Sequence, residues 1–147
     1  MSQGHQRGLR VFVLEGGTAE GEVADGEQAE WTELTAGGKP AVRFSAADLQ
    51  QAQRLRRSLH GAAVVDITVV VDDDFRSAQR LFVELDESAD SLRYAGTLDG
   101  LAGLIADIYV AGVADGVTLI SGAPHQDARA LGEAALVRVA ARLQAAA

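Results

Sequence analysis

The stretch that decides the fold is Val64-Val65-Asp66-Ile67-Thr68-Val69-Val70-Val71. β-branched residues dominate it, and they favour a strand because their side chains fit the pleated surface of a sheet. Apolar residues fall on both faces of this strand, which is typical of a parallel sheet covered by helices. The wider apolar region, residues 62–71, is interrupted by Asp66 and is far shorter than a membrane span. We therefore expect a buried strand at the centre of an α/β domain.

Helical patterns precede and follow this strand. Before it, Ser45-Ala46-Ala47-Asp48 resembles a capping box, and Gly61 stands where a left-handed cap would end the helix. The apolar residues of this helix are Leu49, Ala52, Leu55 and Leu59. After the strand, the expected elements are a helix opening at Asp72-Asp73-Asp74, a helix from Thr97 to Gly112, a strand over residues 117–120 and a final helix from Pro124 to about Ala147. Strands alternating with helices predict a parallel α/β sheet.

The first 45 residues carry weaker signals. Residues 9–14 read as a strand bounded by glycines, and residues 39–44 as a short edge strand, because proline is tolerated at an edge. Residues 18–33 are acidic and glycine-bearing, which predicts a long mobile loop, with Trp31 as its anchor on the body of the domain. We expect a single domain over residues 1–147, divided into this N-terminal part, 1–45, and a helix with βα units, 46–147.

Charge and composition exclude several classes of function. The chain has 147 residues, a formal net charge of −8 and no cysteine, so disulfides and thiolate metal sites are absent. An acidic domain repels nucleic acid, and neither a signal peptide nor a membrane span is recognisable, so we expect a cytoplasmic protein with no nucleic-acid or membrane partner. Arg54, Arg56 and Arg57 are interpreted as a solvated helix surface. Gly37-Gly38-Lys39 fails as a phosphate loop because Glu33 and Pro40 stand where Gly and Ser or Thr are required.

Residues 62–147 contain a series of recognisable pieces. They are Ile67-Thr68-Val69-Val70-Val71-Asp72-Asp73-Asp74, Gly96-Thr97-Leu98-Asp99-Gly100, Ala111-Gly112-Val113-Ala114-Asp115-Gly116-Val117-Thr118-Leu119-Ile120 and Ser121-Gly122-Ala123-Pro124-His125. In this order they resemble the closing segment of the luciferase-like flavin-dependent monooxygenases, including the alkanesulfonate monooxygenase branch. The Ser-Gly-x-Pro-His turn after an apolar strand is the most specific piece. Residues 2–61 show no correspondence with that family.

The resemblance implies parallel βα units like those in the C-terminal part of a (β/α)₈ barrel. A complete barrel takes about 250 residues, whereas this chain holds about three or four βα units and is truncated relative to the family. We therefore expect an incomplete barrel or a rearranged compact sheet. A part-barrel leaves sheet edges and an apolar face to be covered, which favours a homodimer or a partner subunit. The resemblance also implies FMN or a deazaflavin as cofactor.

The candidate cofactor-binding residues are Ser121, Gly122, Pro124 and His125. They follow a strand and precede a helix, where free N–H groups attract an anion such as a phosphate. The alternative is that Gly122 and Pro124 serve the turn and His125 lies on the surface. Asp72-Asp73-Asp74 is interpreted as a helix start rather than a cation site, and no metal site is predicted. No residue is singled out as catalytic.

Three functions stay open on the sequence. The first is a luciferase-like flavin-dependent oxidoreductase or monooxygenase of reduced size, with a cofactor site shared between subunits. The second is a non-catalytic interaction or regulatory module derived from that family. The third is an unrelated small α/β ligand-binding domain. The residues name no substrate and do not choose between FMN and a deazaflavin.

Overall fold

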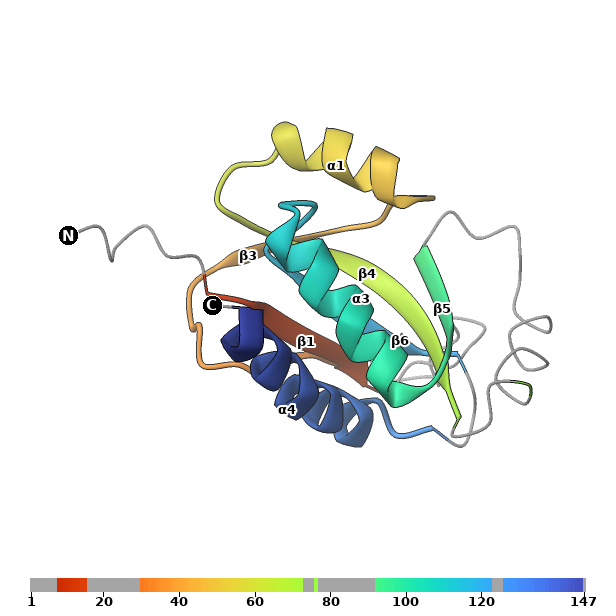
Figure 1. Ribbon diagram of the computed structural model, residues 1–147. Helices are drawn as coiled ribbons and strands as arrows, with labels where there is room; N and C mark the ends of the chain where they lie inside the picture. Colours follow the sequence, from red (N-terminus) through yellow and green to blue (C-terminus); the bar gives the residue numbers. More distant parts are fainter. Residues whose placement is uncertain (1–7, 16–29, 73–75, 77–91, 123–125, 147) are drawn as a thin grey trace.

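The computed structural model describes residues 8–15, 30–72, 76, 92–122 and 126–146 (Figure 1). Its elements, in chain order, are β1 (Arg10–Glu15), β2 (Glu30–Glu33), β3 (Ala41–Phe44), α1 (Leu49–Arg57), β4 (Ala62–Val71), β5 (Leu92–Gly96), α3 (Leu98–Val110), β6 (Gly116–Ser121) and α4 (Ala128–Ala146). The result is a mixed α/β structure around one curled sheet.

The sheet is mostly parallel, in the order β2-β1-β6-β4-β3. Only β2 runs antiparallel to its neighbour, β1. The far edge of β4 is shared by two strands: β3 pairs with residues 62–65, and β5 pairs with residues 67–71. The predicted α/β class with parallel strands is therefore confirmed, and its curled sheet is compatible with an incomplete barrel.

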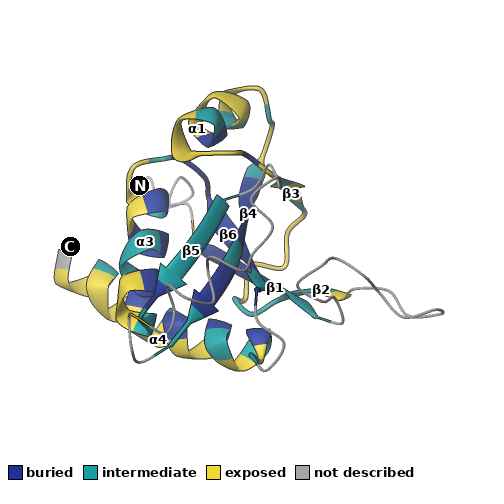
Figure 2. Cartoon of the chain, turned by 90° about the vertical axis from the view of Figure 1, so that its right-hand side faces the viewer, coloured by how far each residue is buried: buried dark blue, intermediate teal, exposed yellow. Residues whose placement is uncertain are grey.

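Helices α3 and α4 cover one face of the sheet (Figure 2). The strand residues that face them are Val11, Val13, Val65, Ile67, Val69, Val117 and Leu119, all buried in the main core. Since side chains alternate along a strand, Phe12, Val64 and Thr118 point to the opposite face. These three are buried as well. The central strands are thus buried on both faces, as the sequence predicted.

Several predicted elements are confirmed with their caps. The Thr97 hydroxyl accepts a hydrogen bond from the Gly100 N–H, and α3 follows directly. Gly112, just after this helix, has a φ of 76°, in the left-handed region that glycine reaches without strain. The strands predicted at residues 9–14, 64–71 and 117–120 are β1, β4 and β6. The edge strand expected at residues 39–44 is β3.

The start of α1 corrects the sequence prediction. Its N-cap is Asp48, whose carboxylate accepts from the Gln51 N–H, whereas the Ser45 hydroxyl donates to Asp66. The expected apolar stripe is also only partly buried. Ala52 is fully buried, but Leu49 and Leu55 are 41% and 37% exposed. Ala52 is the only residue of α1 that is buried, so this helix has no continuous apolar stripe against the body.

Two strands were not predicted. Residues 92–96 form β5 beside β4, although the sequence suggested no strand there. The last four residues of the predicted loop form β2, because Trp31 stacks on Phe12 with ring centroids 4.3 Å apart. The Trp31 indole N–H also donates to the Thr118 hydroxyl at 2.9 Å. Trp31 is thus confirmed as the anchor. The rest of that loop, residues 18–29, lies outside the described residues.

The final helix begins later than predicted. α4 starts at Ala128, and Asp127 Oδ1 accepts hydrogen bonds from the backbone N–H groups of Arg129 and Ala130. Asp127 thus caps the helix, whereas the sequence placed Pro124 at its first position. Pro124 itself, together with the helix opening expected at Asp73 and Asp74, lies outside the described residues.

Candidate functional site

The predicted cofactor site lies at the carboxyl end of β6. Of its four residues, Ser121 and Gly122 are described, whereas Pro124 and His125 are not. The Gly122 N–H donates to the Val69 carbonyl at 2.8 Å, so it ties β6 to β4. The Ser121 hydroxyl accepts a hydrogen bond of 3.2 Å from the Gln126 side chain.

Gln126 connects the carboxyl ends of β4 and β6. Its amide nitrogen also donates to the Val69 carbonyl at 2.8 Å, and its amide oxygen accepts from the Val71 N–H at 2.7 Å. With Asp127 capping α4, the N–H groups of Gly122, Arg129 and Ala130 all have partners within the chain. Ser121 and Gly122 therefore contribute to the sheet, and their role toward a phosphate stays a prediction.

The Gly96-Thr97-Leu98-Asp99-Gly100 motif has a structural reason. The Tyr94 hydroxyl donates to the Thr97 carbonyl at 2.8 Å and lies between the two glycines. A Cβ atom at Gly96 or Gly100 would come within 2.5 or 2.2 Å of the Tyr94 hydroxyl oxygen. Burial raises the pKa of Tyr94, which keeps the phenol protonated. This part of the resemblance therefore packs the β5–α3 junction.

A pocket of about 470 Å³ opens at the opposite, amino end of the parallel strands. Its lining includes Gly8, Arg10, Gly37, Lys39, Arg56 and Asp115. Gly61 and Ala62, at the start of β4, complete the wall. Three cationic side chains and one carboxylate thus surround a space large enough for a small metabolite.

Arg10 is fixed in this pocket by Glu33. Its Nε and Nη2 atoms donate to the two carboxylate oxygens at 2.5 and 2.8 Å, and Nη2 also donates to the Lys39 carbonyl at 2.5 Å. Hydrogen bonding from Arg10, followed by that from Thr35 and Gly38, lowers the pKa of Glu33 to about 2. Gly37 leaves the room that Arg10 occupies, because a Cβ there would lie 2.3 Å from Nε. Arg10 is therefore a rigid cation at the pocket wall.

Arg56 reaches the same pocket from α1. Its Nη2 atom lies 2.9 Å from Asp115 Oδ2, and its Nη1 atom donates to the Leu59 carbonyl at 3.2 Å. Asp115 is buried and also accepts from the Ala63 N–H at 2.8 Å. The Nε atom of Arg56 is buried and has no hydrogen-bond partner among the described residues. One donor of this guanidinium is therefore unsatisfied.

The sequence prediction for the arginines of α1 is correct for two of three. Arg54 and Arg57 are exposed, whereas the Arg56 side chain is only 23% exposed and paired with Asp115. The Gly37–Lys39 segment, which fails as a phosphate loop, nevertheless reaches the pocket beside Arg10. Among the ion pairs of the described residues, none involves the Lys39 ammonium.

Among the described residues, no group of three or more His, Asp or Glu side chains is arranged to hold a metal ion. No helix formed by these residues is long and apolar enough to cross a membrane.

Comparison with known proteins returns no match: no family model, no curated protein and no solved structure corresponds to this chain.

Proposed function

We propose that this chain is a luciferase-like flavin-dependent oxidoreductase or monooxygenase of reduced size, which holds FMN or a deazaflavin at the carboxyl end of its sheet. The observation that carries the proposal is the order of its βα units. Strands β4 and β6 are parallel, and β6 lies between α3 and α4 along the chain, as in the resemblance; β5 is an additional strand. The carboxyl ends of β1, β4, β5 and β6 meet at one edge, where α/β folds bind ligands.

The face of the sheet opposite α3 and α4 offers a surface for a planar ring. Trp31 stacks on Phe12 at an interplanar angle of 13°, and it pairs with Leu14, one residue before the end of β1. Thr118 fixes the indole through its N–H. An aromatic ring that is half-buried and held on two sides is preorganised to stack on an isoalloxazine ring, a contact worth about 0.5–1.5 kcal/mol.

The described residues fit the ring better than the phosphate. The N–H groups of Gly122, Arg129 and Ala130 have partners, and the Asp127 carboxylate opposes a second anion there. Riboflavin, which lacks the phosphate, is therefore expected to bind about as well as FMN. A bound flavin would supply the redox chemistry, and the chain would orient the ring and exclude water.

A curled sheet alone contacts only one face of a flavin ring and leaves the other face exposed to solvent. We propose that a second copy of the chain, or a partner subunit, supplies the other wall. In a (β/α)₈ barrel the ligand pocket is built by loops from many strands, and this chain provides only part of that number. Assembly and flavin binding are therefore expected to occur together.

The test is a titration with oxidised and reduced FMN, riboflavin and a deazaflavin. Trp31 is the only tryptophan, so quenching of its emission reports binding at the proposed surface. We expect saturable quenching with a Kd on the order of micromolar, in a sample whose mass by light scattering exceeds the monomer. Trp31→Ala should weaken binding, whereas Trp31→Phe should retain it when followed by flavin fluorescence. Absence of binding at every oligomeric state would overturn the proposal.

A non-catalytic interaction module is the second candidate, and one observation favours it. Val42, Leu49 and Leu55 are exposed apolar residues on β3 and α1, with Val42 40% exposed. Exposed apolar side chains are candidates for contacts with other proteins. Double replacement by serine, Leu49→Ser with Leu55→Ser, should then abolish self-association. Loss of the oligomer in a protein that binds no flavin would favour this candidate over the first.

A further inference from the structure

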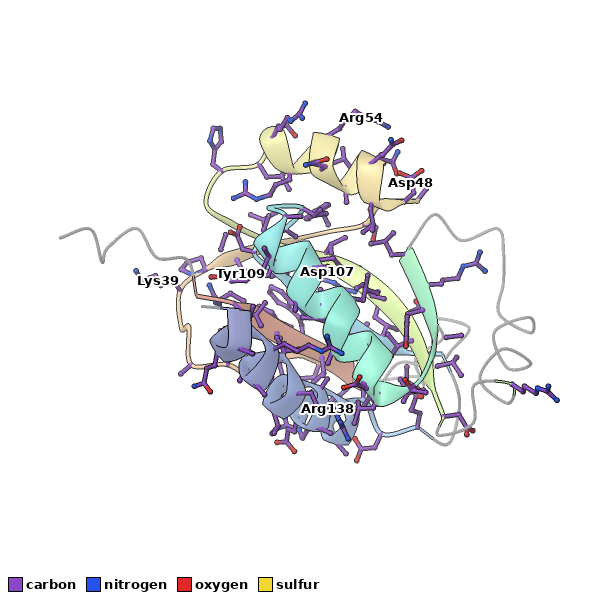
Figure 3. The ribbon with its side chains drawn as sticks, in the orientation of Figure 1. Lys39, Asp48, Arg54, Asp107, Tyr109 and Arg138 are labelled. Carbon is purple, nitrogen blue, oxygen red and sulfur yellow. The ribbon has the colours of Figure 1, made fainter. Side chains whose placement is uncertain are left out.

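The amino end of the sheet concentrates positive charge in an acidic protein. The chain carries a formal net charge of −8, yet Arg10, Lys39 and Arg56 line one pocket. Their residues come from β1, from the segment before β3 and from α1 (Figure 3, where Lys39 is labelled near the start of β1). A general solvated surface does not explain this arrangement, because two of the three guanidinium and ammonium groups are held in place by partners deep in the structure.

We propose that this pocket binds a small phosphate-bearing metabolite, with Arg10, Lys39 and Arg56 as its anion-binding residues. The site is separate from the proposed flavin surface. β6 has six residues, so its two ends lie about 17 Å apart.

Each cation has a distinct capacity to bind. Arg10 uses Nε and Nη2 for Glu33 and Lys39, and this leaves its Nη1 atom, with two N–H groups, for a ligand. Lys39 is exposed and forms no ion pair within the described part of the chain, so its ammonium can move to the ligand without breaking one. Charge-assisted hydrogen bonds of these kinds are about twice as strong as neutral ones.

Arg56 has a buried donor that a ligand could satisfy. Its Nε atom is buried without a partner, a state that costs about 1–3 kcal/mol. If the guanidinium turns toward a phosphate, it regains a partner for this donor and can bind two oxygens at once. Asp115 would retain the Ala63 N–H as a hydrogen-bond donor after that movement. The contacts to the phosphate must therefore offset the loss of the Arg56–Asp115 ion pair, which is about 2 kcal/mol.

Size and charge restrict the class of ligand. A volume of about 470 Å³ exceeds the needs of a phosphate ion and lies in the range of pockets for small molecules. The three cations outnumber the single lining carboxylate, Asp115. Glycines at positions 8, 37 and 61 form part of the lining without adding side chains to it. A phosphate monoester of a small polar molecule fits these properties.

The experiment uses isothermal titration of the full chain with pyrophosphate and ribose 5-phosphate, with ribose as the uncharged control. Both phosphates should bind saturably with a Kd between about 10 µM and 1 mM, and ribose should not bind. Lys39→Gln and Arg56→Gln should each weaken binding about tenfold. Arg54→Gln is the matched control, because Arg54 lies on the outside of the same helix (Figure 3).

Two results would overturn the proposal. One is the lack of saturable binding of either phosphate up to about 10 mM. The other is an equal loss of affinity in Arg54→Gln, which would mean that overall charge and not the pocket holds the ligand. Amide NMR spectra provide a second measurement that does not need a variant. Pyrophosphate should shift the Gly37 and Gly61 resonances and leave those of Ser121 and Gly122 in place, whatever the outcome for flavin.

Discussion

The two ends of the parallel strands differ in what they offer a ligand. At the carboxyl end, the polar groups of Ser121, Gly122 and Gln126 hold β4 and β6 together. At the amino end, charged side chains from separate elements surround a pocket, and one buried donor of Arg56 has no partner among the described residues. α/β folds usually bind ligands at the carboxyl end of the strands, which is tightly hydrogen-bonded in this chain. The amino end is usually associated with stability, and here it carries the charged side chains of the pocket.

The two ends therefore differ in whether their hydrogen-bond donors already have partners within the chain. A helix N-terminus attracts anions through its free N–H groups, and the Asp127 carboxylate already accepts from those of Arg129 and Ala130 in α4. Flavin binding at the carboxyl end is thus expected to depend on the Trp31 ring. Phosphate binding is expected at the amino end.

The largest effect should come from a substitution that forces β1 and β6 apart. A Cβ at Gly116 would lie 1.8 Å from the Arg10 carbonyl oxygen, a backbone atom that cannot move independently. Gly116→Ala should destabilise the protein by about 3 kcal/mol and abolish phosphate binding. Urea unfolding followed by Trp31 emission measures this. Gly8→Ala, with open space around it, is the control, and equal stability of the two variants would contradict the expectation.

Asp115→Asn should separate stability from binding at the amino end. The buried Arg56 guanidinium loses its partner charge, which should cost about 2 kcal/mol. The pocket meanwhile becomes more positive, so pyrophosphate should bind several-fold more tightly. Titration and urea unfolding of the same variant measure both effects. Asp107→Asn, on the exposed side of α3, should change neither (Figure 3). Weaker pyrophosphate binding in Asp115→Asn would mean that the carboxylate, not the cations, organises the ligand.

At the carboxyl end, Gln126→Ala tests whether the hydrogen-bonded junction supports flavin binding. Loss of its bonds to Val69, Val71 and Ser121 should cost about 1–2 kcal/mol. Hydrogen exchange at the Val71 amide should accelerate and flavin affinity should fall, while pyrophosphate affinity stays the same. Gln50→Ala, exposed on α1, is the matched control. A parallel loss of pyrophosphate affinity would show that the two ends are coupled.

The smallest effect is a pH dependence at the amino end. The pKa of Glu33 falls from its ordinary 4.5 to about 2 in the folded chain, so its pairing with Arg10 stabilises the protein above pH 4.5. This stabilisation is lost as the pH falls toward 2 and should amount to about 1 kcal/mol after solvent screening. The stability gap between the wild type and Glu33→Gln should therefore shrink between pH 6 and pH 2.5 in urea unfolding. Glu30→Gln, exposed on β2, should show no such convergence.

Much of the fold could be predicted from the sequence, because its strongest patterns are local. The β-branched run in β4 and the caps of α3 at Thr97 and Gly112 each depend on neighbouring residues alone. β5 was missed because Gly96 and Gly100 suggest a turn in the sequence. In the structure these two glycines make room for the bulky Tyr94. β2 was missed because an acidic segment pairs only where Trp31 stacks on a distant phenylalanine.

The amino-end pocket was beyond sequence analysis for a different reason. Arg10, Lys39 and Arg56 belong to three separate segments, and only the sheet topology brings them together. Arg56 looked like one of three surface arginines, since its partner Asp115 lies in the turn before β6. A usable signal existed in one place: Asp115 immediately precedes a buried strand, and buried carboxylates are rarely left without a cation.

The place of β1 in the sheet has a consequence for biosynthesis. This strand enters the sheet between β2 and β6, and its last residue, Glu15, pairs with Arg129, 114 positions later. β2 is synthesised soon after β1, but the pairing of β1 with β6 can form only after Gly116–Ser121 have been synthesised. Such distant pairing slows folding, and the apolar run of β4 stays unshielded during that interval. A circular permutant that opens the chain between β2 and β3 and joins the present termini would shorten the separation of β1 and β6 along the chain. We expect it to fold faster.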